Sequence, residues 1–138
     1  MKKLLSICLV IVLMLTVMPL GIFPASAANY SGVCGPNLTW QLNTNTGVLT
    51  VAGNGKMYDY SGYTAPWYSQ RGNIKTVIIN SGVTSIGDSA FSNCENLTSI
   101  EVPDSVNSMG GWAFSNCGLS SFKIPKNVIS ISEYAFTW

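Results

Sequence analysis

A block of about 22 residues recurs three times in the second half of this chain. The units begin at Ile74, Leu97 and Leu119, so the spacing is 23 and then 22 residues. The string AFSNC occurs in the first two units, and the chain closes on a shortened copy, AFTW. A regular period of this length predicts a solenoid, in which each unit buries its apolar side against the units above and below it.

Apolar residues occupy the same columns in all three units. The aligned columns are Val77, Ile100 and Phe122; Ile79, Val102 and Ile124; Val83, Val106 and Val128; Ile86, Met109 and Ile131; and the pairs Ala90-Phe91, Ala113-Phe114 and Ala135-Phe136. The first two columns alternate with polar residues, which predicts a short strand with one face inward. Pro103 and Pro125 are expected to end this strand, because proline cannot donate to a ladder. The next two columns predict a second extended piece.

Small residues around the Ala-Phe pair predict a bend followed by a brief helical turn. Gly87 and Gly110 permit a tight bend, and Asp88 is placed to cap the helical turn. Cys94 and Cys117 fall in adjacent coils, about 4.8 Å apart. That separation would allow a disulfide, but side chains in one column point the same way. The sequence therefore favours a column of buried thiols.

The first 27 residues have the pattern of a secretory signal peptide. Lys2 and Lys3 form a basic start, an apolar run follows, and Ala25-Ser26-Ala27 is a small-residue cleavage site. An uncleaved membrane anchor is the alternative, because the apolar run is nearly long enough to span a bilayer. Helix-breaking residues at the end of the run favour cleavage after Ala27. We therefore expect export and no membrane segment in the remaining chain.

The composition excludes several classes of function. Charged residues make up 9% of the chain, whereas nucleic-acid binding needs clustered Lys and Arg. Histidine is absent, which removes the commonest general base and metal ligand. Three of the six carboxylates lie at predicted turns, and no facing pair is evident. The prediction is therefore a protein without catalytic residues, metal ligands or cofactor, and without a nucleic-acid partner.

Residues 28–73 do not carry the period and are predicted to form a β-rich cap on the first coil. Apolar residues alternate over Leu38–Leu42, and a second strand follows with either Val48 or Leu49 inward. The polar stretch Asn43–Gly47 between them is a turn signal. This pattern predicts a β-hairpin.

The same segment is dense in Tyr and Trp. Trp40, Trp67 and Tyr68 are expected to cover the open end of the first coil. Three other tyrosines form a candidate aromatic patch: Tyr58, Tyr60 and Tyr63. For these three, a role in the cap and a platform for stacking sugars both stay open, because Tyr combines an apolar face with a polar tip.

The unit LTSIEVPDSVNSMGGWAFSNC closely resembles the BspA-like leucine-rich repeats of bacterial surface proteins. The stretch from SGVCGPNLTW to APWYS resembles the segment that often precedes them. Asn80 replaces a proline in the first unit, Ser132 replaces a glycine in the third, and the last unit lacks its Cys. The resemblance implies a leucine-rich-repeat solenoid, mostly β with short helical turns. It also implies a secreted or cell-wall-associated bacterial protein that serves binding or adhesion.

Three segments are therefore expected: a signal peptide over 1–27, the β-rich cap over 28–73 and the repeats over 74–138, the last unit being incomplete. No polar closing coil follows the repeats, although solenoids normally need one. We expect an N-terminal portion of a longer protein. Self-association through the uncapped last coil is the alternative.

The predicted function is non-catalytic binding of a protein or polysaccharide through the strand-lined face. The alternatives are a solvated face without a partner, a self-associating structural solenoid, and a spacer module of a multidomain surface enzyme. Glu101 and Lys123 share a column and are expected to pair across strands. The candidate binding residues are Lys75, Thr76, Ile78, Thr98, Ser99, Glu101, Ser120, Ser121 and Lys123.

Overall fold

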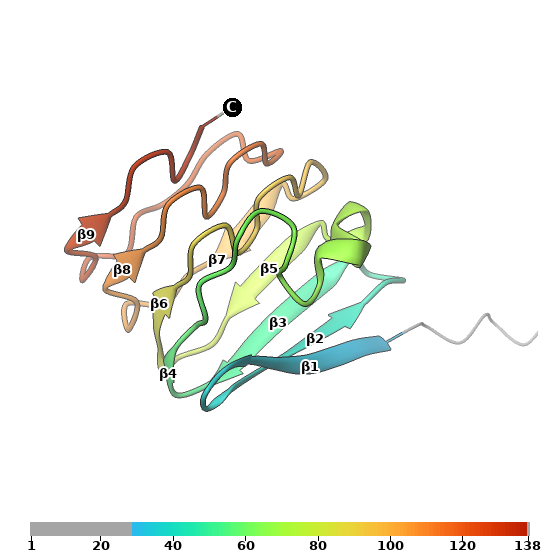
Figure 1. Ribbon diagram of the computed structural model, residues 1–138, viewed down its shortest axis with the longest axis horizontal. Coiled ribbons are helices and arrows are strands. Elements are labelled where there is room, and N and C mark those ends of the chain that lie inside the picture. The colour runs from blue at the N-terminus through green and yellow to red at the C-terminus, as the bar shows by residue number, and fades with distance from the viewer. Residues whose placement is uncertain (1–28, 138) are drawn as a thin grey trace, which may run out of the picture.

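The computed structural model of the protein describes residues 29–137, which form nine strands and one 3-10 helix. In chain order these are β1 (Asn29–Gly35), β2 (Leu38–Asn43), β3 (Val48–Gly53), β4 (Gly55–Lys56), the helix η1 (Tyr68–Asn73), β5 (Thr76–Ile79), β6 (Val83–Ile86), β7 (Ser99–Glu101), β8 (Ser108–Met109) and β9 (Ser130–Ile131). The coils stack from the blue N-terminal end to the red C-terminal end (Figure 1).

The strands lie in two sheets that run along the stack. The first has five strands in the order β1-β2-β3-β5-β7, and the second has four in the order β4-β6-β8-β9. Neighbouring coils pair in parallel, with Val77 opposite Ile100 in the first sheet and Ser85 opposite Ser108 in the second. The period of the sequence is therefore the register of the sheets, and the predicted leucine-rich-repeat solenoid is confirmed.

The third side of each coil is a run of turns, not the predicted helical turn. Ser89 and Asn93 have left-handed backbone angles, φ 51° and 59°, and a left-handed residue interrupts a right-handed helix. Backbone amides of this segment instead donate to the next coil. The amide of Ser89 donates to the Gly111 carbonyl and that of Phe91 to the Ala113 carbonyl, both at 2.8 Å.

Asp88 joins three successive coils instead of capping a helix. Its backbone amide donates to Oδ1 of Asp59 at 3.0 Å, and its own Oδ1 accepts from the amide of Gly111 at 2.8 Å. The side chain thus satisfies an amide of the following coil, which a cap within its own coil would not do.

Gly87 and Gly110 are required by close stacking and not by backbone bending. A Cβ atom on Gly87 would overlap the carbonyl oxygen of Tyr58, and one on Gly110 would overlap the amide of Asp88. Neither glycine has a positive φ. The two glycines therefore let the backbone of one coil approach the backbone of the coil before it.

A column of aromatic rings fills the interior of the stack. Phe91 stacks on Phe114 with ring centroids 5.6 Å apart, and Phe114 stacks on Phe136 at 5.2 Å. Trp67 continues the column at the other end, 5.3 Å from Phe91 and nearly parallel to it. Trp67 is buried, and its indole N–H donates to the Ala90 carbonyl at 2.7 Å.

The coil path begins before Ile74, in a segment whose sequence does not show the period. Strand β3 pairs in parallel with β5, Leu49 lying opposite Val77, and β4 pairs in parallel with β6. Together with Trp67 in the aromatic column, these strands make one further coil upstream of the repeats.

An insertion hides this upstream coil in the sequence. Asp59 bonds Asp88 as Asp88 bonds Gly111, and Trp67 stacks as Phe91 does. Trp67 lies eight positions after Asp59, whereas Phe91 lies three positions after Asp88. The longer loop breaks the spacing on which recognition of a repeat depends.

The predicted hairpin is present as β2 and β3, with Trp40 opposite Val51. Leu49, and not Val48, is the inward residue at the start of β3. Strand β1 adds a further antiparallel strand that the sequence did not predict, because only its last two residues are buried. Trp40 packs edge-on against Trp67 with centroids 5.5 Å apart.

The three cysteines of the described range are free and buried. The prediction of buried thiols for Cys94 and Cys117 is thereby confirmed. The Cys117 thiol donates to the Phe91 carbonyl at 3.1 Å, which satisfies its one polar group inside the stack.

Candidate functional site

The outward face of the five-stranded sheet presents one continuous row of side chains. The pairing registers link the row across all five strands, in the order Ser31, Gln41, Thr50, Ile78 and Glu101. Neighbouring strands lie about 4.8 Å apart, so the row is about 19 Å long. Three of its members are short or medium polar residues, with one apolar residue and one carboxylate at the β5–β7 side.

Four of the predicted face residues lie together on this surface. Thr76 lies opposite Ser99 and Ile78 lies opposite Glu101 on neighbouring strands β5 and β7. Ser99 and Glu101 are exposed, and Thr76 and Ile78 are half-buried between their neighbours.

Lys75 and Thr98 lie directly before these strands. The Lys75 carbonyl accepts from the backbone amide of Thr98 at 3.0 Å. Both side chains are exposed at the edge of the row. They therefore border the face rather than form its centre.

The third unit departs from the predicted arrangement. Ser120, Ser121 and Lys123 are exposed, but their segment is not paired as a strand. The expected ion pair between Glu101 and Lys123 is wrong. Without a strand at this place, nothing holds Lys123 opposite Glu101.

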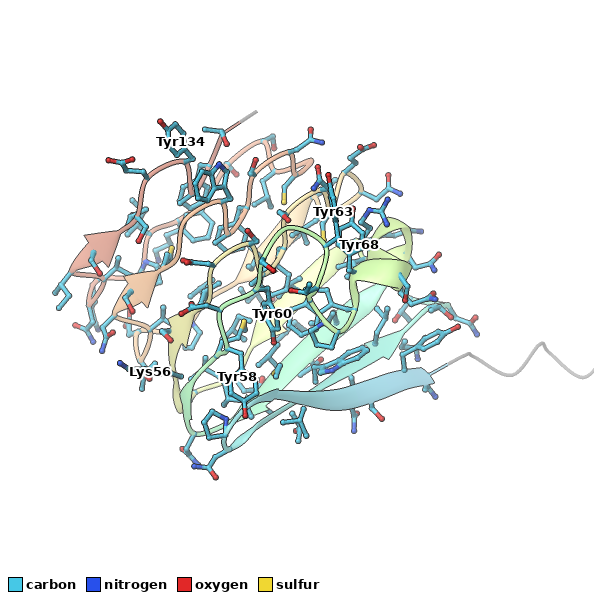
Figure 2. The ribbon with its side chains drawn as sticks, in the orientation of Figure 1. Lys56, Tyr58, Tyr60, Tyr63, Tyr68 and Tyr134 are labelled. Atoms are coloured by element: carbon cyan, nitrogen blue, oxygen red, sulfur yellow. The ribbon has the colours of Figure 1, made fainter. Side chains whose placement is uncertain are left out.

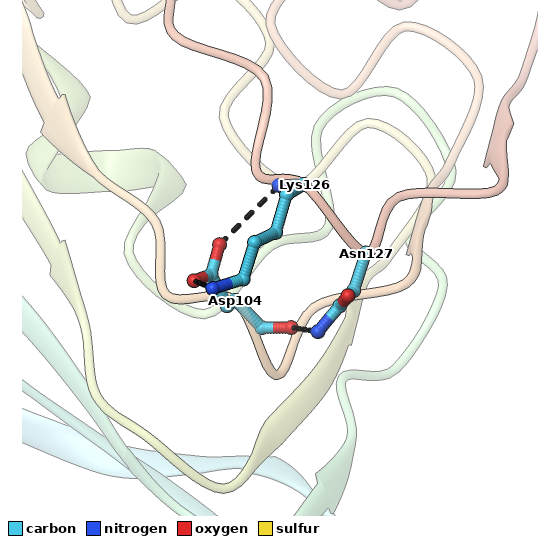
Figure 3. A network of polar contacts seen from close by, with 3 residues as sticks. All are labelled: Asp104, Lys126 and Asn127. Atoms are coloured by element: carbon cyan, nitrogen blue, oxygen red, sulfur yellow. Dashed lines mark hydrogen bonds and ion pairs between the residues drawn. The ribbon is translucent and has the colours of Figure 1, made fainter.

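The ion pair that the structure shows in residues 29–137 joins Lys126 and Asp104, with Nζ and Oδ2 2.9 Å apart (Figure 3). Asn127 adds a bond from its side-chain amide to the Asp104 carbonyl at 2.7 Å. This network ties the turn of one coil to the turn of the next and lies outside the face.

The hairpin contributes a shallow groove of about 490 Å3 to the same side of the molecule. Gln41, Thr46 and Thr50 supply polar lining, and Tyr30 lies at its edge. The sequence reasoning did not include these residues, because the segment was interpreted as a cap alone. The alternation of Thr39 and Gln41 with buried residues was the signal that pointed to an exposed strand face.

The three tyrosines predicted as an aromatic patch divide between two environments. Tyr60 is partly buried: its hydroxyl donates to the Cys34 carbonyl at 3.3 Å and its ring lies 5.9 Å from Trp67. Burial raises the pKa of Tyr60 well above its usual value. Tyr63 is exposed and packs on Tyr68 (Figure 2).

Tyr60 and Tyr63 line a groove of about 500 Å3 on the turn side, and Tyr58 is not among its lining residues. The opposite wall is Trp112, whose ring stacks on Tyr134 with centroids 5.2 Å apart. Sequence reasoning missed both of these residues. They share the aligned column directly before the Ala-Phe pair, and an aromatic residue there in two units was an available signal.

The thiols are poorly suited to nucleophilic chemistry. Burial raises the pKa of Cys34 to about 11 and that of Cys117 to about 12, and it also raises the pKa of Cys94. At neutral pH these groups are protonated, and the thiolate is the reactive form. Within residues 29–137, His, Cys, Asp and Glu form no group of three or more that could hold a metal ion.

Residues 65–138 match the BspA type leucine-rich repeat region (6 copies). This match covers more than half of the chain. The chain belongs to the BspA-type leucine-rich repeat family. The prediction from the unit sequence is therefore confirmed.

Two solved structures are similar to this BspA-type chain. A leucine-rich repeat protein from Eubacterium ventriosum is 35% identical with a TM-score of 0.75, and the match covers 80% of this chain and 30% of that one. A leucine-rich repeat protein from Bacteroides ovatus is 24% identical with a TM-score of 0.39, covering 78% and 38%. The chain thus spans about a third of the length of these proteins. No curated protein matches it.

The helical content of the described chain gives no membrane-crossing element. Within residues 29–137, no helix has the length and apolar character that a membrane span requires.

Proposed function

We propose that this chain is the recognition part of an exported bacterial surface protein, and that it binds a protein partner through the outward face of the five-stranded sheet. The observation that carries the proposal is the unbroken row from Ser31 to Glu101, which is held in register across five strands. A surface built on paired strands is rigid, so binding costs little ordering of the backbone.

The chemistry of the row favours a protein over a sugar. The row consists of Ser, Gln, Thr, Ile and Glu and therefore has no aromatic ring on which a sugar could stack. Ile78 supplies an apolar centre, and Thr50 and Glu101 on either side supply polar groups. An apolar centre with a polar border is the usual arrangement of a protein–protein interface.

Export and surface location rest on two supports. The first 27 residues, which lie outside the described range, have the signal-peptide pattern. The BspA-type repeat is typical of surface-associated proteins, which makes adhesion the proposed consequence of binding. We propose a non-catalytic role, because the buried thiols are protonated and no metal-binding cluster is found among the described residues.

We also propose that β1 and β2 act as the cap of the stack. Trp40 packs on Trp67, the first ring of the aromatic column, and thereby shields it from solvent. A solenoid needs such a cover at its end.

Beads coated with the purified chain test the binding face. The beads are applied to bacterial and epithelial cells before and after protease treatment of the cells. We expect Ile78→Asp and Glu101→Lys to reduce capture about tenfold or more. Glu133→Lys makes the same charge change on another side of the coil and should leave capture unchanged.

Two results would overturn this proposal. One is capture that survives protease treatment of the cells. The other is capture that persists in the Ile78→Asp variant while its circular dichroism shows the native fold.

Self-association is a second candidate function, favoured by the exposure of apolar residues in the last coil. Ile124, Ile129 and Ile131 are exposed there. Sedimentation velocity should show a species that grows with concentration in the unsubstituted chain and a monomer in Ile129→Lys. A monomer at every concentration of the unsubstituted chain would contradict this candidate.

A further inference from the structure

The groove on the turn side has two aromatic walls that are each held by a second ring. Tyr63 is 71% exposed and packs on Tyr68 at 5.1 Å, and Trp112 is 50% exposed and stacks on Tyr134 at 5.2 Å. The guanidinium of Arg71 lies 4.2 Å from the Tyr68 ring centroid and supports that pair from behind. The exposed rings are therefore positioned before any ligand arrives.

Trp112 occupies a backbone position that folding does not explain. Its φ is 52°, and that of Tyr134 in the same column is 61°. Bulky residues rarely adopt this left-handed region, and strained positions of this kind cost about 1–3 kcal/mol. The other left-handed column holds Asn93 and Asn116, a residue type that tolerates the conformation.

The ring of Trp112 is half-exposed and contributes little to the core, so stability alone would favour Asn or Gly at this position. Strained residues of this kind cluster at binding sites. The aromatic residue therefore points to a ligand that uses the ring.

The insertion in the upstream coil builds the other wall. The later coils connect the position of Asp88 to that of Phe91 in three residues, so the longer connection from Asp59 to Trp67 is not needed to form a coil. Its loop is fastened to the groove floor, where the Ser92 hydroxyl donates to the Gly62 carbonyl at 3.3 Å. The extra residues place Tyr60 and Tyr63 along the groove.

The floor between the two walls is polar and carries one charged group. Ser89, Asn93 and Ser115 supply hydroxyl and amide groups, and Asp88 supplies a carboxylate. The side chain of Asn93 is held in place, since its Oδ1 accepts from the Asn116 amide at 3.1 Å. Hydrogen-bonding groups thus lie beside apolar ring faces.

We propose that this groove binds a neutral oligosaccharide built of pyranose rings. The C–H face of a pyranose packs on an aromatic ring, and its hydroxyls pair with Asn, Ser and carboxylate groups. The groove volume of about 500 Å3 lies within the range of small-molecule sites. This site is separate from the proposed protein-binding face and does not depend on it.

Isothermal titration with cellotriose, maltotriose and tri-N-acetylchitotriose tests the proposal. We expect at least one trisaccharide to bind the purified chain. Trp112→Ala and Tyr63→Ala should weaken binding by about tenfold or more. Tyr30→Ala removes an exposed ring outside the groove and should leave binding unchanged, as should Ile78→Asp on the sheet face.

Trp112→Asn separates binding from folding. Asn tolerates the left-handed backbone, so this variant should unfold at the same temperature as the unsubstituted chain or higher, and still lose the sugar. The proposal is overturned if none of the three sugars binds at millimolar concentration. It is also overturned if Trp112→Asn keeps full affinity, or if Tyr30→Ala loses as much affinity as Trp112→Ala.

Discussion

The two ends of the stack contain the same apolar columns but bury them to different extents. Ile86 is 1% exposed, and Ile131, two coils later in the same column, is 40% exposed. Ile79 and Ile124 show the same contrast, at 3% and 53%. Since the residue types are identical within each pair, the adjoining coil decides burial and the unit's own sequence does not. Stability of such a stack is a sum of unit terms and neighbour terms.

The N-terminal end shows what an adjoining element adds. Trp67 is almost fully buried because Trp40 and Tyr60 pack on it from one side and Phe91 from the other. Phe136, at the far end of the same column, is packed by Phe114 and Phe122 and stays partly exposed. We therefore expect the energetic cost of a substitution to fall along the stack toward the last coil.

The largest effect is expected for Trp67→Ala, which should lower the free energy of unfolding by about 3–5 kcal/mol, the range for a buried large aromatic side chain. Trp112→Ala removes an exposed ring and should cost less than about 1.5 kcal/mol, the value of an aromatic pair. Urea unfolding followed by circular dichroism measures both. Equal losses in the two variants would contradict the buried role of Trp67.

Gly87→Ala should follow in size, because its methyl group would overlap the Tyr58 carbonyl of the preceding coil. Overpacking of this kind costs about 1–3 kcal/mol or more. In Gly111→Ala the nearest atom, the Glu133 carbonyl oxygen, would lie 3.3 Å away, so a much smaller loss is expected. Thermal unfolding of both variants tests the close stacking, which a similar loss in each would refute.

The buried thiols predict a pH dependence at neutral to alkaline pH. Burial raises the pKa of Cys117 from 9.0 to about 12 in the folded chain. Between these values the unfolded chain loses its proton first, so this contribution to stability is complete below about pH 9 and is lost as the pH rises toward about 12. The urea midpoint should fall over this interval, and Cys117→Ala should reduce the fall. An identical pH profile in the variant would argue against a buried thiol.

The smallest effect is expected at the surface ion pair. Asp104 and Lys126 are 50% and 76% exposed, and exposed pairs contribute little to stability. Lys126 lowers the pKa of Asp104 through a side-chain hydrogen bond, but solvent and salt screen this interaction. Asp104→Asn should leave the urea midpoint within experimental error. A clear drop would show that the turn network in Figure 3 holds the last coils together.

The regular parts of the fold could be predicted from the sequence because their residues follow one rule. Columns such as Val83, Val106 and Val128 repeat at a constant spacing, and the hairpin strands alternate with a period of two. The upstream coil could not be found in this way, because the insertion before Trp67 changes the spacing. The turns were predicted as helical because left-handed angles at Ser89 and Trp112 leave no trace in a pattern of apolar residues.

The candidate site was predicted in part for the same reason. Thr76 and Glu101 follow from the alternation within the repeats, whereas Gln41 and Thr50 join the row only through pairing of the hairpin with the upstream coil. Trp112 and Tyr63 meet across one groove although 49 positions separate them in the sequence. A proximity of this kind depends on the stacking of coils, which a single unit does not encode.

Comparison of Ile86→Ala with Ile131→Ala tests the central claim most directly, because the two residues share a type and a column. The free energy of unfolding should fall by about 2–5 kcal/mol for Ile86→Ala, the range for a buried Ile. For Ile131→Ala the loss should stay below about 1 kcal/mol, since much of this side chain is already in water. Equal losses at the two positions would contradict the claim that neighbouring coils decide the burial and stability of each unit.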